Sequence, residues 1–279
     1  MVASMNGRAL LTELTAALGP VSACPELEAA EMLRHFCGLD RRAILLGAEG
    51  DPEPVRRALS RRLEGEPLQY ILGEWDFYGR AYRVGPGVLI PRPETELLIE
   101  QALAFGAGKP IRAADLCAGS GCLGITLALE LPGSRVTVLE KSGEALSYLR
   151  KNAALHHAEL DIRQDDVLSP AQDYPQYQLI LSNPPYIPDG EPLQREVLRE
   201  PEMALRGGPD GLEFYRGIAE RWTEHLEPDG MLALEIGKGQ EEAVRKILEN
   251  NRLKNICFYQ DLCGIIRVIT ARRGCAGKG

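Results

Sequence analysis

From residue 111 to near the C-terminus, short apolar segments alternate with longer segments of helical periodicity. The pattern predicts strands at 111–116, 135–140, 160–163, 177–181 and 231–236, and helices at 123–131, 143–156, 213–226 and 240–250. Parallel strands need crossover connections, so this alternation predicts a mostly parallel sheet with helices on both faces. Two further strands, 257–260 and 265–271, have no helix between them. We therefore expect the last strand to be antiparallel.

Residues 8–72 have a different pattern, which is helical. Leucines recur at helical spacing up to Gly19-Pro20, which ends the first helix. A second helix is predicted at 26–37 and a third at 54–64. Their apolar faces are predicted to contain Leu27, Ala30, Leu33 and Phe36 in the second helix, and Val55, Leu59 and Leu63 in the third.

Aromatic residues around Gly79 indicate a β-hairpin between the two patterns. The prediction is a helical domain at 1–74, a hairpin linker at 75–92 and an α/β domain at 93–279. Thr95 is expected to cap the helix that follows the linker.

Arginines gather on the polar side of the third predicted helix and just before it: Arg41, Arg42, Arg56, Arg57, Arg61 and Arg62. One interpretation is a solvated face. The other is a docking surface for an acidic partner or for RNA.

The composition limits the classes of function. A net charge of −8 argues against a surface built to neutralise phosphates over its whole extent. No apolar run approaches the roughly 18 residues of a membrane span. The 7 cysteines are scattered, and no metal-binding spacing of cysteine or histidine is present, so we expect reduced thiols, no metal and a cytoplasmic location.

The first motif that carries chemistry runs from Asp115 to Gly124, where a strand is predicted to end and a helix to begin. Its glycines remove side chains where the backbone must approach a ligand closely. Glu140 ends the next strand, 19 residues after Gly121, where a carboxylate can accept both ribose hydroxyls. Together they predict a nucleoside cofactor, either a nicotinamide dinucleotide or S-adenosylmethionine.

Asp165-Asp166-Val167 follows the third strand of the α/β region. Of the two acids, Asp166 is the predicted partner of an adenine amino group, with Val167 packed on the ring. The alternative is an exposed acidic pair.

Asn183-Pro184-Pro185-Tyr186 stands where the fourth strand ends. Two prolines stop the strand because neither can donate a ladder hydrogen bond. The Asn183 side-chain oxygen and the Pro184 carbonyl can each accept one N–H of a planar amide or amine, while Tyr186 packs on its plane. A group held in this way is oriented for methyl transfer to nitrogen.

These motifs resemble the class I S-adenosylmethionine-dependent methyltransferases, and more closely the peptide chain release factor N5-glutamine methyltransferases, the PrmC/HemK family. The resemblance covers nearly the whole chain. It rests on Glu66 to Gly73, Leu89-Ile90-Pro91-Arg92-Pro93-Glu94-Thr95-Glu96, Asp115 to Gly121, Asn183 to Ile187, and Glu200-Pro201. It implies a Rossmann-like seven-stranded methyltransferase sheet with an antiparallel last strand, preceded by a small helical domain and a β-hairpin linker.

The resemblance also implies a reaction and a set of site residues. The reaction is methyl transfer from S-adenosyl-L-methionine, leaving S-adenosyl-L-homocysteine, to the glutamine amide of the Gly-Gly-Gln motif in class 1 release factors. Glu140 would hold the ribose. The other implied cofactor contacts are Cys117, Ala118, Gly119, Ser120 and Gly121 for the methionine part, Asp166 and Val167 for the adenine, and Asn183. The substrate glutamine would contact Asn183, Pro184, Pro185 and Tyr186, among which Asn183, Pro184 and Tyr186 would be catalytic.

Three positions depart from the frequent family pattern: Cys117 after Leu116, Glu140 in place of aspartate, and Val167 in place of a bulkier residue. Other functions stay open, namely a glutamine methyltransferase of a ribosomal protein, a nucleic-acid N6-adenine methyltransferase, and a non-catalytic binding protein. We expect a monomer that binds neither DNA nor membranes.

Overall fold

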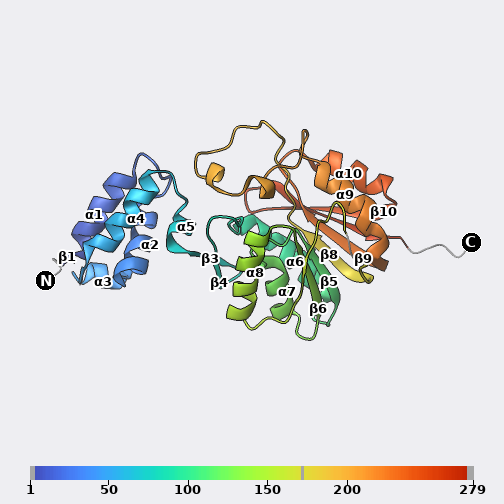
Figure 1. The fold of residues 1–279 in the computed structure, drawn as a ribbon, viewed down its shortest axis with the longest axis horizontal. Coiled ribbons are helices and arrows are strands. Elements are labelled where there is room, and N and C mark those ends of the chain that lie inside the picture. The colour runs from blue at the N-terminus through green and yellow to red at the C-terminus, as the bar shows by residue number, and fades with distance from the viewer. Residues whose placement is uncertain (1–3, 171–172, 275–279) are drawn as a thin grey trace, which may run out of the picture. The chain divides into compact units, whose positions relative to one another are not determined.

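The computed structural model describes residues 4–170 and 173–274. The chain forms two compact units, Met1–Glu74 with Leu193–Arg199, and Trp75–Pro192 with Glu200–Gly279. The first unit is helical and the second contains the large sheet (Figure 1). The sequence predicted domains made of consecutive residues, and it did not predict that Leu193–Arg199 belongs to the helical unit.

The helical unit begins with a minimal ladder between β1 (Met5–Asn6) and β2 (Glu49–Gly50). Its helices are α1 (Gly7–Leu18), α2 (Pro25–Cys37), α3 (Arg41–Leu45), α4 (Pro52–Leu63) and α5 (Leu68–Leu72). Side chains of Asn6, Asp40 and Asp51 cap α1, α3 and α4 by accepting backbone N–H bonds. The short helices α3 and α5 were not predicted separately, because each is little longer than one helical turn.

The buried face of α2 differs from the predicted one. The structure buries Ala29, Met32 and Leu33, whereas Leu27 is 52% exposed. Leu33 belongs to both stripes, and the packing of α1 and α4 against α2 selects the stripe that contains Met32. Leu63, at the last turn of α4, is also exposed rather than buried.

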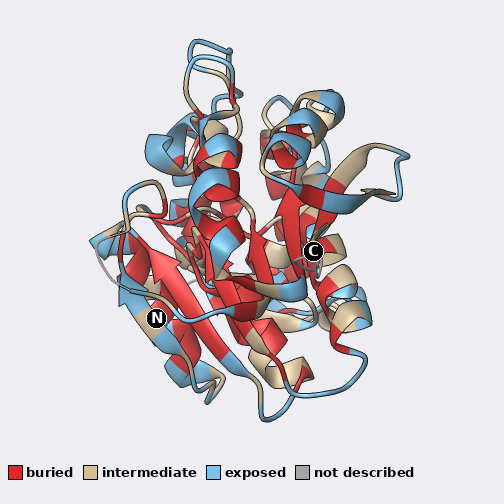
Figure 2. Cartoon of the chain, turned by 90° about the vertical axis from the view of Figure 1, so that its right-hand side faces the viewer, coloured by how far each residue is buried: buried red, intermediate tan, exposed pale blue. Residues whose placement is uncertain are grey.

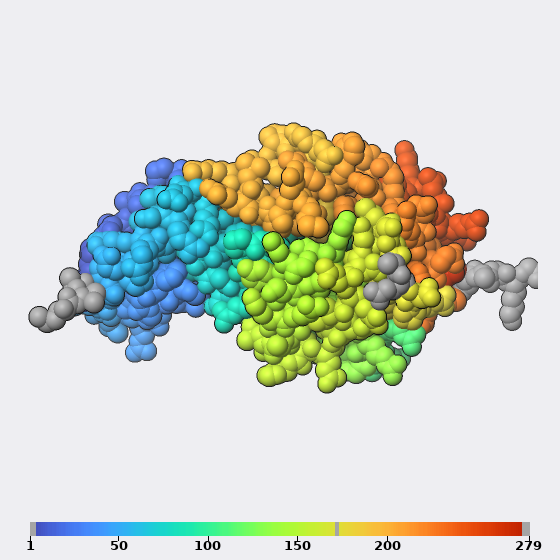
Figure 3. Space-filling model, viewed as in Figure 1, coloured from blue at the N-terminus to red at the C-terminus, as the bar shows by residue number. Residues whose placement is uncertain are grey.

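Arg62 is not part of an exposed arginine face. Its side chain is 3% exposed and forms ion pairs with Glu28 at 2.8 Å and Glu196 at 2.6 Å. Glu196 lies in the segment Leu193–Arg199, which therefore joins the helical unit through this ion pair. The surface of the segment is visible beside that unit in Figure 3. The more exposed Arg56 and Arg61 pair with Glu13 and Glu66, leaving fewer arginines for an external partner.

Replacing Arg62 with methionine is expected to lower the free energy of unfolding of the helical unit by about 2–4 kcal/mol, because Glu28 is left half-buried without its partner. Arg61→Met removes an exposed pair and should cost less than about 1 kcal/mol. Urea unfolding followed by circular dichroism measures both. Equal losses for the two variants would contradict a structural role for the Arg62 ion pairs.

The second unit contains a hairpin, a sheet and the helices that cover it. Its strands are β3 (Glu74–Phe77), which begins at the last residue of the first unit, β4 (Arg80–Arg83), β5 (Arg112–Leu116), β6 (Arg135–Glu140), β7 (Asp161–Gln164), β8 (Tyr177–Ser182), β9 (Leu226–Glu235), β10 (Leu253–Gln260) and β11 (Ile266–Arg273). Its helices are α6 (Glu96–Gly106), α7 (Cys122–Glu130), α8 (Gly143–Leu155), α9 (Glu213–Trp222) and α10 (Glu241–Asn250), with 3₁₀ turns η1 (Pro93–Thr95), η3 (Glu202–Ala204) and η4 (Thr223–His225). A further turn, η2 (Val197–Arg199), belongs to the first unit.

The sheet has seven strands in the order β10-β11-β9-β8-β5-β6-β7. β5, β6, β7, β8 and β9 are parallel, and β11 is antiparallel to both of its neighbours. This confirms the predicted fold class, including the antiparallel last strand. The sequence order of the strands reverses between β5 and β8, which defines a topological switch point.

The boundary between the helix predicted at 213–226 and the strand predicted at 231–236 was wrong. α9 and η4 end before Leu226, and Pro228-Asp229-Gly230, a sequence typical of a helix stop, lies inside β9. Opposite Tyr177 and Leu179 of β8, the pairing passes from Leu226 directly to Met231, so the intervening residues form a bulge. Asp229 adopts a φ of 62° there.

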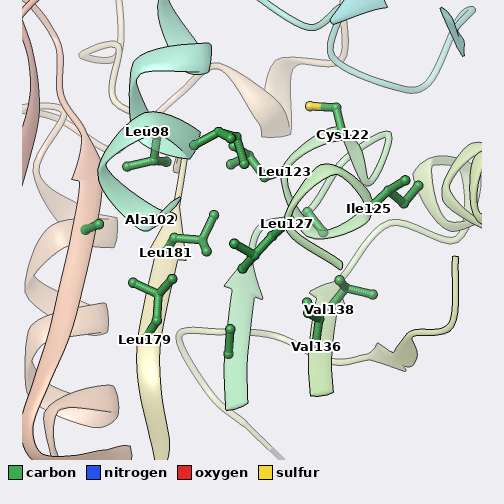
Figure 4. Close-up of a cluster of buried hydrophobic side chains, with 14 of the residues drawn as sticks. Leu98, Ala102, Cys122, Leu123, Ile125, Leu127, Val136, Val138, Leu179 and Leu181 are labelled. Carbon is green, nitrogen blue, oxygen red and sulfur yellow. The ribbon is translucent and has the colours of Figure 1, made fainter. Parts of the chain in front are cut away.

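Helices cover both faces of the sheet. On one face, α6, α7 and α8 bury apolar side chains against alternate residues of the strands, as the close-up in Figure 4 shows for Leu98, Leu127, Val138, Leu179 and Leu181. On the other face, α9 and α10 pack against the intervening residues. The inner strands β5, β6, β8 and β9 are accordingly buried along most of their length, whereas most residues of the edge strands β7 and β10 are exposed or half-buried (Figure 2).

The hairpin β3–β4 is packed tightly against the α/β unit. Tyr78 and Gly79 form its two-residue turn with positive φ angles of 51° and 71°. The Tyr82 hydroxyl lies 2.8 Å from that of Thr126, and Asn152 exchanges two hydrogen bonds with the backbone of Arg83. Within the described ranges, no helix combines the length and apolar character required to cross a membrane.

Candidate active site

A cleft opens at the carboxyl ends of the parallel strands, beside the switch point between β5 and β8. It is lined by the loops after β5, β6, β7 and β8 and by two outer loops, 87–95 and 201–204. Of the predicted site residues, Cys117, Ala118, Gly119, Ser120, Glu140, Asp166, Val167, Asn183 and Pro185 line it. Gly121, Pro184 and Tyr186 are not among the lining residues.

The glycine turn after β5 has the geometry that its sequence predicts. Gly121 is the N-cap residue of α7 with a φ of 80°. At Gly124 a Cβ atom would lie 2.4 Å from the Val138 side chain, so only glycine permits this approach of α7 to β6. Asp115, fully buried beneath the turn, accepts the Gly124 N–H at 2.9 Å, and burial raises its pKa to about 8.

Glu140 joins the first two loops of the cleft. Its carboxylate accepts the N–H of Gly119 at 2.8 Å and that of Ser142 at 2.7 Å. Burial raises the pKa of Glu140, and these backbone hydrogen bonds oppose the shift. Each carboxylate oxygen has a second lone pair, so the same side chain can also accept hydroxyl hydrogens from a ligand.

Asp165 and Asp166 both line the cleft, but their environments differ. Asp165 is 8% exposed and accepts the hydroxyl of Tyr174 at 2.6 Å. Asp166 is more accessible and forms an ion pair with Lys141 at 2.8 Å. Asp166 is therefore the acid with more surface for a ligand, and Val167, 4% exposed, lies beside it.

Asn183 follows β8 directly and is half-buried, while the two prolines after it are buried. The Asn183 Nδ2 atom donates to the Thr95 hydroxyl at 3.1 Å. Thr95 in turn donates to Glu235 at 2.5 Å. The prediction that Thr95 caps α6 was therefore wrong, because its hydroxyl bonds Glu235 and Asn183 and makes no cap hydrogen bond.

Tyr186 points to the same carboxylate. Its hydroxyl donates to Glu235 at 3.3 Å, and its backbone carbonyl accepts a hydrogen bond from Gln240 at 2.9 Å. Burial and the nearby Glu235 carboxylate raise the pKa of the Tyr186 phenol. The structure thus connects Asn183, Thr95, Glu235 and Tyr186.

Sequence reasoning assigned no site role to Glu235 or Thr95. Glu235 ends β9 as Glu140 ends β6, so the same strand-end argument could have found it. For Thr95, the sequence predicted only a helix cap.

The charges of the cleft favour a cationic nucleoside over a dinucleotide. The acids that line it are Glu140, Asp165 and Asp166, and its basic side chains are Arg92 and Lys141. Both bases already form ion pairs, Arg92 with Glu200 and Lys141 with Asp166. The negative charge of a pyrophosphate would lie next to carboxylates, with no unpaired basic side chain among the lining residues to offset it. A positively charged sulfonium nucleoside is electrostatically favoured beside the same carboxylates.

Comparison with known proteins agrees with this geometry. A family model described as Methyltransferase small domain matches residues 93–208, and one described as PrmC N-terminal domain matches residues 9–73. The chain is 40% identical over 256 residues to a release factor glutamine methyltransferase of Geobacter sulfurreducens, covering 89% of each chain. It is 39% identical over 258 residues to one of Neisseria gonorrhoeae, covering 89% of this chain and 93% of the relative.

Solved structures share the fold. A methyltransferase from Pyrococcus furiosus superposes with a TM-score of 0.52 at 15% identity, covering 78% of this chain and 99% of the other. A ribosomal protein L11 methylase from Lactobacillus delbrueckii gives a TM-score of 0.52 at 20% identity, covering 70% and 86%. At these identities the similarity concerns the fold alone.

Proposed function

The chain belongs to the release factor glutamine methyltransferase family, and we propose that it methylates the side-chain amide nitrogen (N5) of the glutamine in the Gly-Gly-Gln motif of class 1 peptide chain release factors. The methyl donor is S-adenosylmethionine, which supplies an electrophilic methyl group on a positively charged sulfur. The observation that carries the proposal is one cleft that contains both the acidic nucleoside subsite and the amide of Asn183.

The proposal gives each predicted site residue a role, in the cleft or directly beside it. Glu140 holds the ribose, Asp166 and Val167 hold the adenine, and the turn of Cys117 to Gly121 holds the methionine part. The Asn183 side-chain oxygen and the Pro184 carbonyl accept the two N–H groups of the substrate glutamine. Pro185 and Tyr186 shape the pocket around them.

This arrangement addresses the weak nucleophilicity of an amide nitrogen, whose lone pair is delocalised. Two acceptors fix the NH₂ group in one orientation, so less orientational entropy is lost on reaching the transition state. The same acceptors stabilise the positive charge that develops on nitrogen as its bond to the methyl carbon forms. We propose that the surplus proton passes to water, without a side-chain base.

The other functions considered receive less support. Among the described residues, the basic side chains of the cleft are ion-paired, and the net charge is −8, which disfavours a nucleic-acid substrate. The 6 cysteines of the described ranges are free thiols, which supports a cytoplasmic location.

The proposal is tested by incubating the purified chain with methyl-labelled S-adenosylmethionine and, in separate reactions, a class 1 release factor, ribosomes or DNA. Mass spectrometry of digests then locates the label. We expect one methyl group on the glutamine of the Gly-Gly-Gln motif. Label on a ribosomal protein or on adenine, with none on the release factor, would overturn the proposal.

A further inference from the structure

We propose that Glu235 and Thr95 are positioning residues, which hold the Asn183 amide with its oxygen directed to the substrate. The inference rests on the proposed function, since it explains how the amide clamp acquires its orientation. An asparagine side chain can turn over, which exchanges its oxygen and nitrogen. Only the oxygen can accept an N–H from the substrate glutamine.

The hydrogen bonds around Glu235 have one possible direction when the carboxylate is ionised. An ionised carboxylate only accepts, so Thr95 must donate to Glu235 across the 2.5 Å contact. The Thr95 oxygen then offers only lone pairs to its other neighbour, Asn183. The Asn183 atom 3.1 Å away must therefore be Nδ2, the donor.

The opposite end of the Asn183 amide is then its oxygen. Within the residues that the structure describes, the Asn183 Oδ1 atom accepts no hydrogen bond, and Asn183 lines the cleft. An acceptor is thus available on the side that a substrate would approach. Charge on Glu235, two hydrogen bonds away, decides that this atom is an acceptor and not a donor.

The surroundings of Glu235 bring the pKa of its carboxyl group close to neutral pH. It is 1% exposed at the end of β9. Burial raises its pKa to about 7, hydrogen bonds from Thr95 and Tyr186 and the charge of Arg267 oppose the shift, and Glu94 adds to it.

Two further groups lie near this carboxyl. The Tyr215 hydroxyl donates to the backbone carbonyl of Glu235 at 3.1 Å. The thiol of Cys122 is close enough for the Glu235 charge to contribute to its raised pKa.

Protonation of Glu235 removes the directional constraint. The carboxylic acid can donate to Thr95, whose own proton is then free to turn toward Asn183. That arrangement favours the reversed amide, with nitrogen on the substrate side, where two donors would face each other. Activity is therefore expected above a pH of about 7 and should fall as the pH drops through the folded-state pKa of Glu235.

The test compares kcat, KM for the release factor, and the Kd of S-adenosylmethionine in Thr95→Val, Thr95→Ser and Glu235→Gln. We expect Thr95→Val to lower kcat by about 10- to 100-fold, with the cofactor Kd changed less than about threefold. Thr95→Ser keeps the hydroxyl and should stay within about threefold of the wild type. Thr223→Val is the matched control, because Thr223 is also buried but its hydroxyl bonds a helix carbonyl, Ala219, outside the cleft.

The pH dependence of kcat distinguishes the proposed role of Glu235 from a purely structural one, because a loss of packing would not remove an acid limb. The wild-type kcat should show an acid limb near pH 7, and Glu235→Gln should be slow at every pH without that limb. Three results would each overturn the inference. Thr95→Ser could be as slow as Thr95→Val, Thr95→Val could keep the wild-type kcat, or Glu235→Gln could retain the acid limb. If the valine or glutamine variant does not fold, Thr95→Ser and the wild-type profile decide: a slow serine variant or no acid limb would refute it.

Failure of this inference can be separated from failure of the proposed function. If Asn183→Ala is inactive while Thr95→Val is fully active, the amide clamp stands and only its orientation by Glu235 is wrong. If Asn183→Ala is active, the clamp itself is wrong.

Discussion

Replacing Asn183 with alanine is expected to lower kcat for methylation of the release factor by about 10³-fold or more, since it removes both the orientation of the amide and an acceptor for the developing charge. The chain should remain folded, because Asn183 is half-buried and its described hydrogen bond is a single one, to Thr95. Methylated glutamine is quantified by mass spectrometry after timed reactions at saturating S-adenosylmethionine.

Asn251→Ala is a matched control for that experiment. Asn251 lies after α10 and its side chain bonds a helix carbonyl, Ile247, at 2.8 Å, so the variant loses an asparagine amide without altering the cleft. It should retain wild-type kcat. Near-normal activity of Asn183→Ala, with an unchanged melting temperature, would refute the amide clamp and with it the proposed mechanism.

The fold could be predicted from sequence where local signals are strong. The strand from Arg135 to Glu140 was predicted to the residue, because an apolar run ends at a polar residue and a capping serine. The prediction failed where tertiary packing decides which face of a helix is buried, as for the stripe of α2 that contains Met32. It also failed at Pro228-Asp229-Gly230, whose composition indicates a turn while the neighbouring strands hold it as a bulge.

The same distinction applies to the site. Residues at the ends of strands, such as Glu140 and Asn183, could be predicted because the carboxyl ends of parallel strands meet at one edge. Thr95 and Glu235 are far apart in the sequence and meet only through α6 and the sheet. No local pattern assigns a hydroxyl in a 3₁₀ turn to a distant carboxylate. Sequence therefore indicates which residues line the cleft better than which distant side chains form hydrogen bonds with them.

Glu140 shows how a predicted ligand residue can also hold the fold locally. Its carboxylate accepts the N–H groups of Gly119 and Ser142, so a simple loss of cofactor binding in a variant would not reveal a ribose contact. A ribose contact and a local structural role of Glu140 predict different effects on the Kd of different ligands. A ribose contact is lost only with ligands that carry the hydroxyls, whereas a disordered loop weakens every ligand of the cleft.

Glu140→Ala is accordingly best measured against two ligands, S-adenosylhomocysteine and its 2′,3′-dideoxy analogue, by calorimetric titration. If Glu140 holds the ribose, the wild type should bind the hydroxylated ligand about 100-fold more tightly, as two hydrogen bonds to a charged acceptor predict. Glu140→Ala should then bind both ligands with similar Kd. A preference of the same size in wild type and variant would show that Glu140 acts on the loop alone, and that the ribose is recognised elsewhere in the cleft.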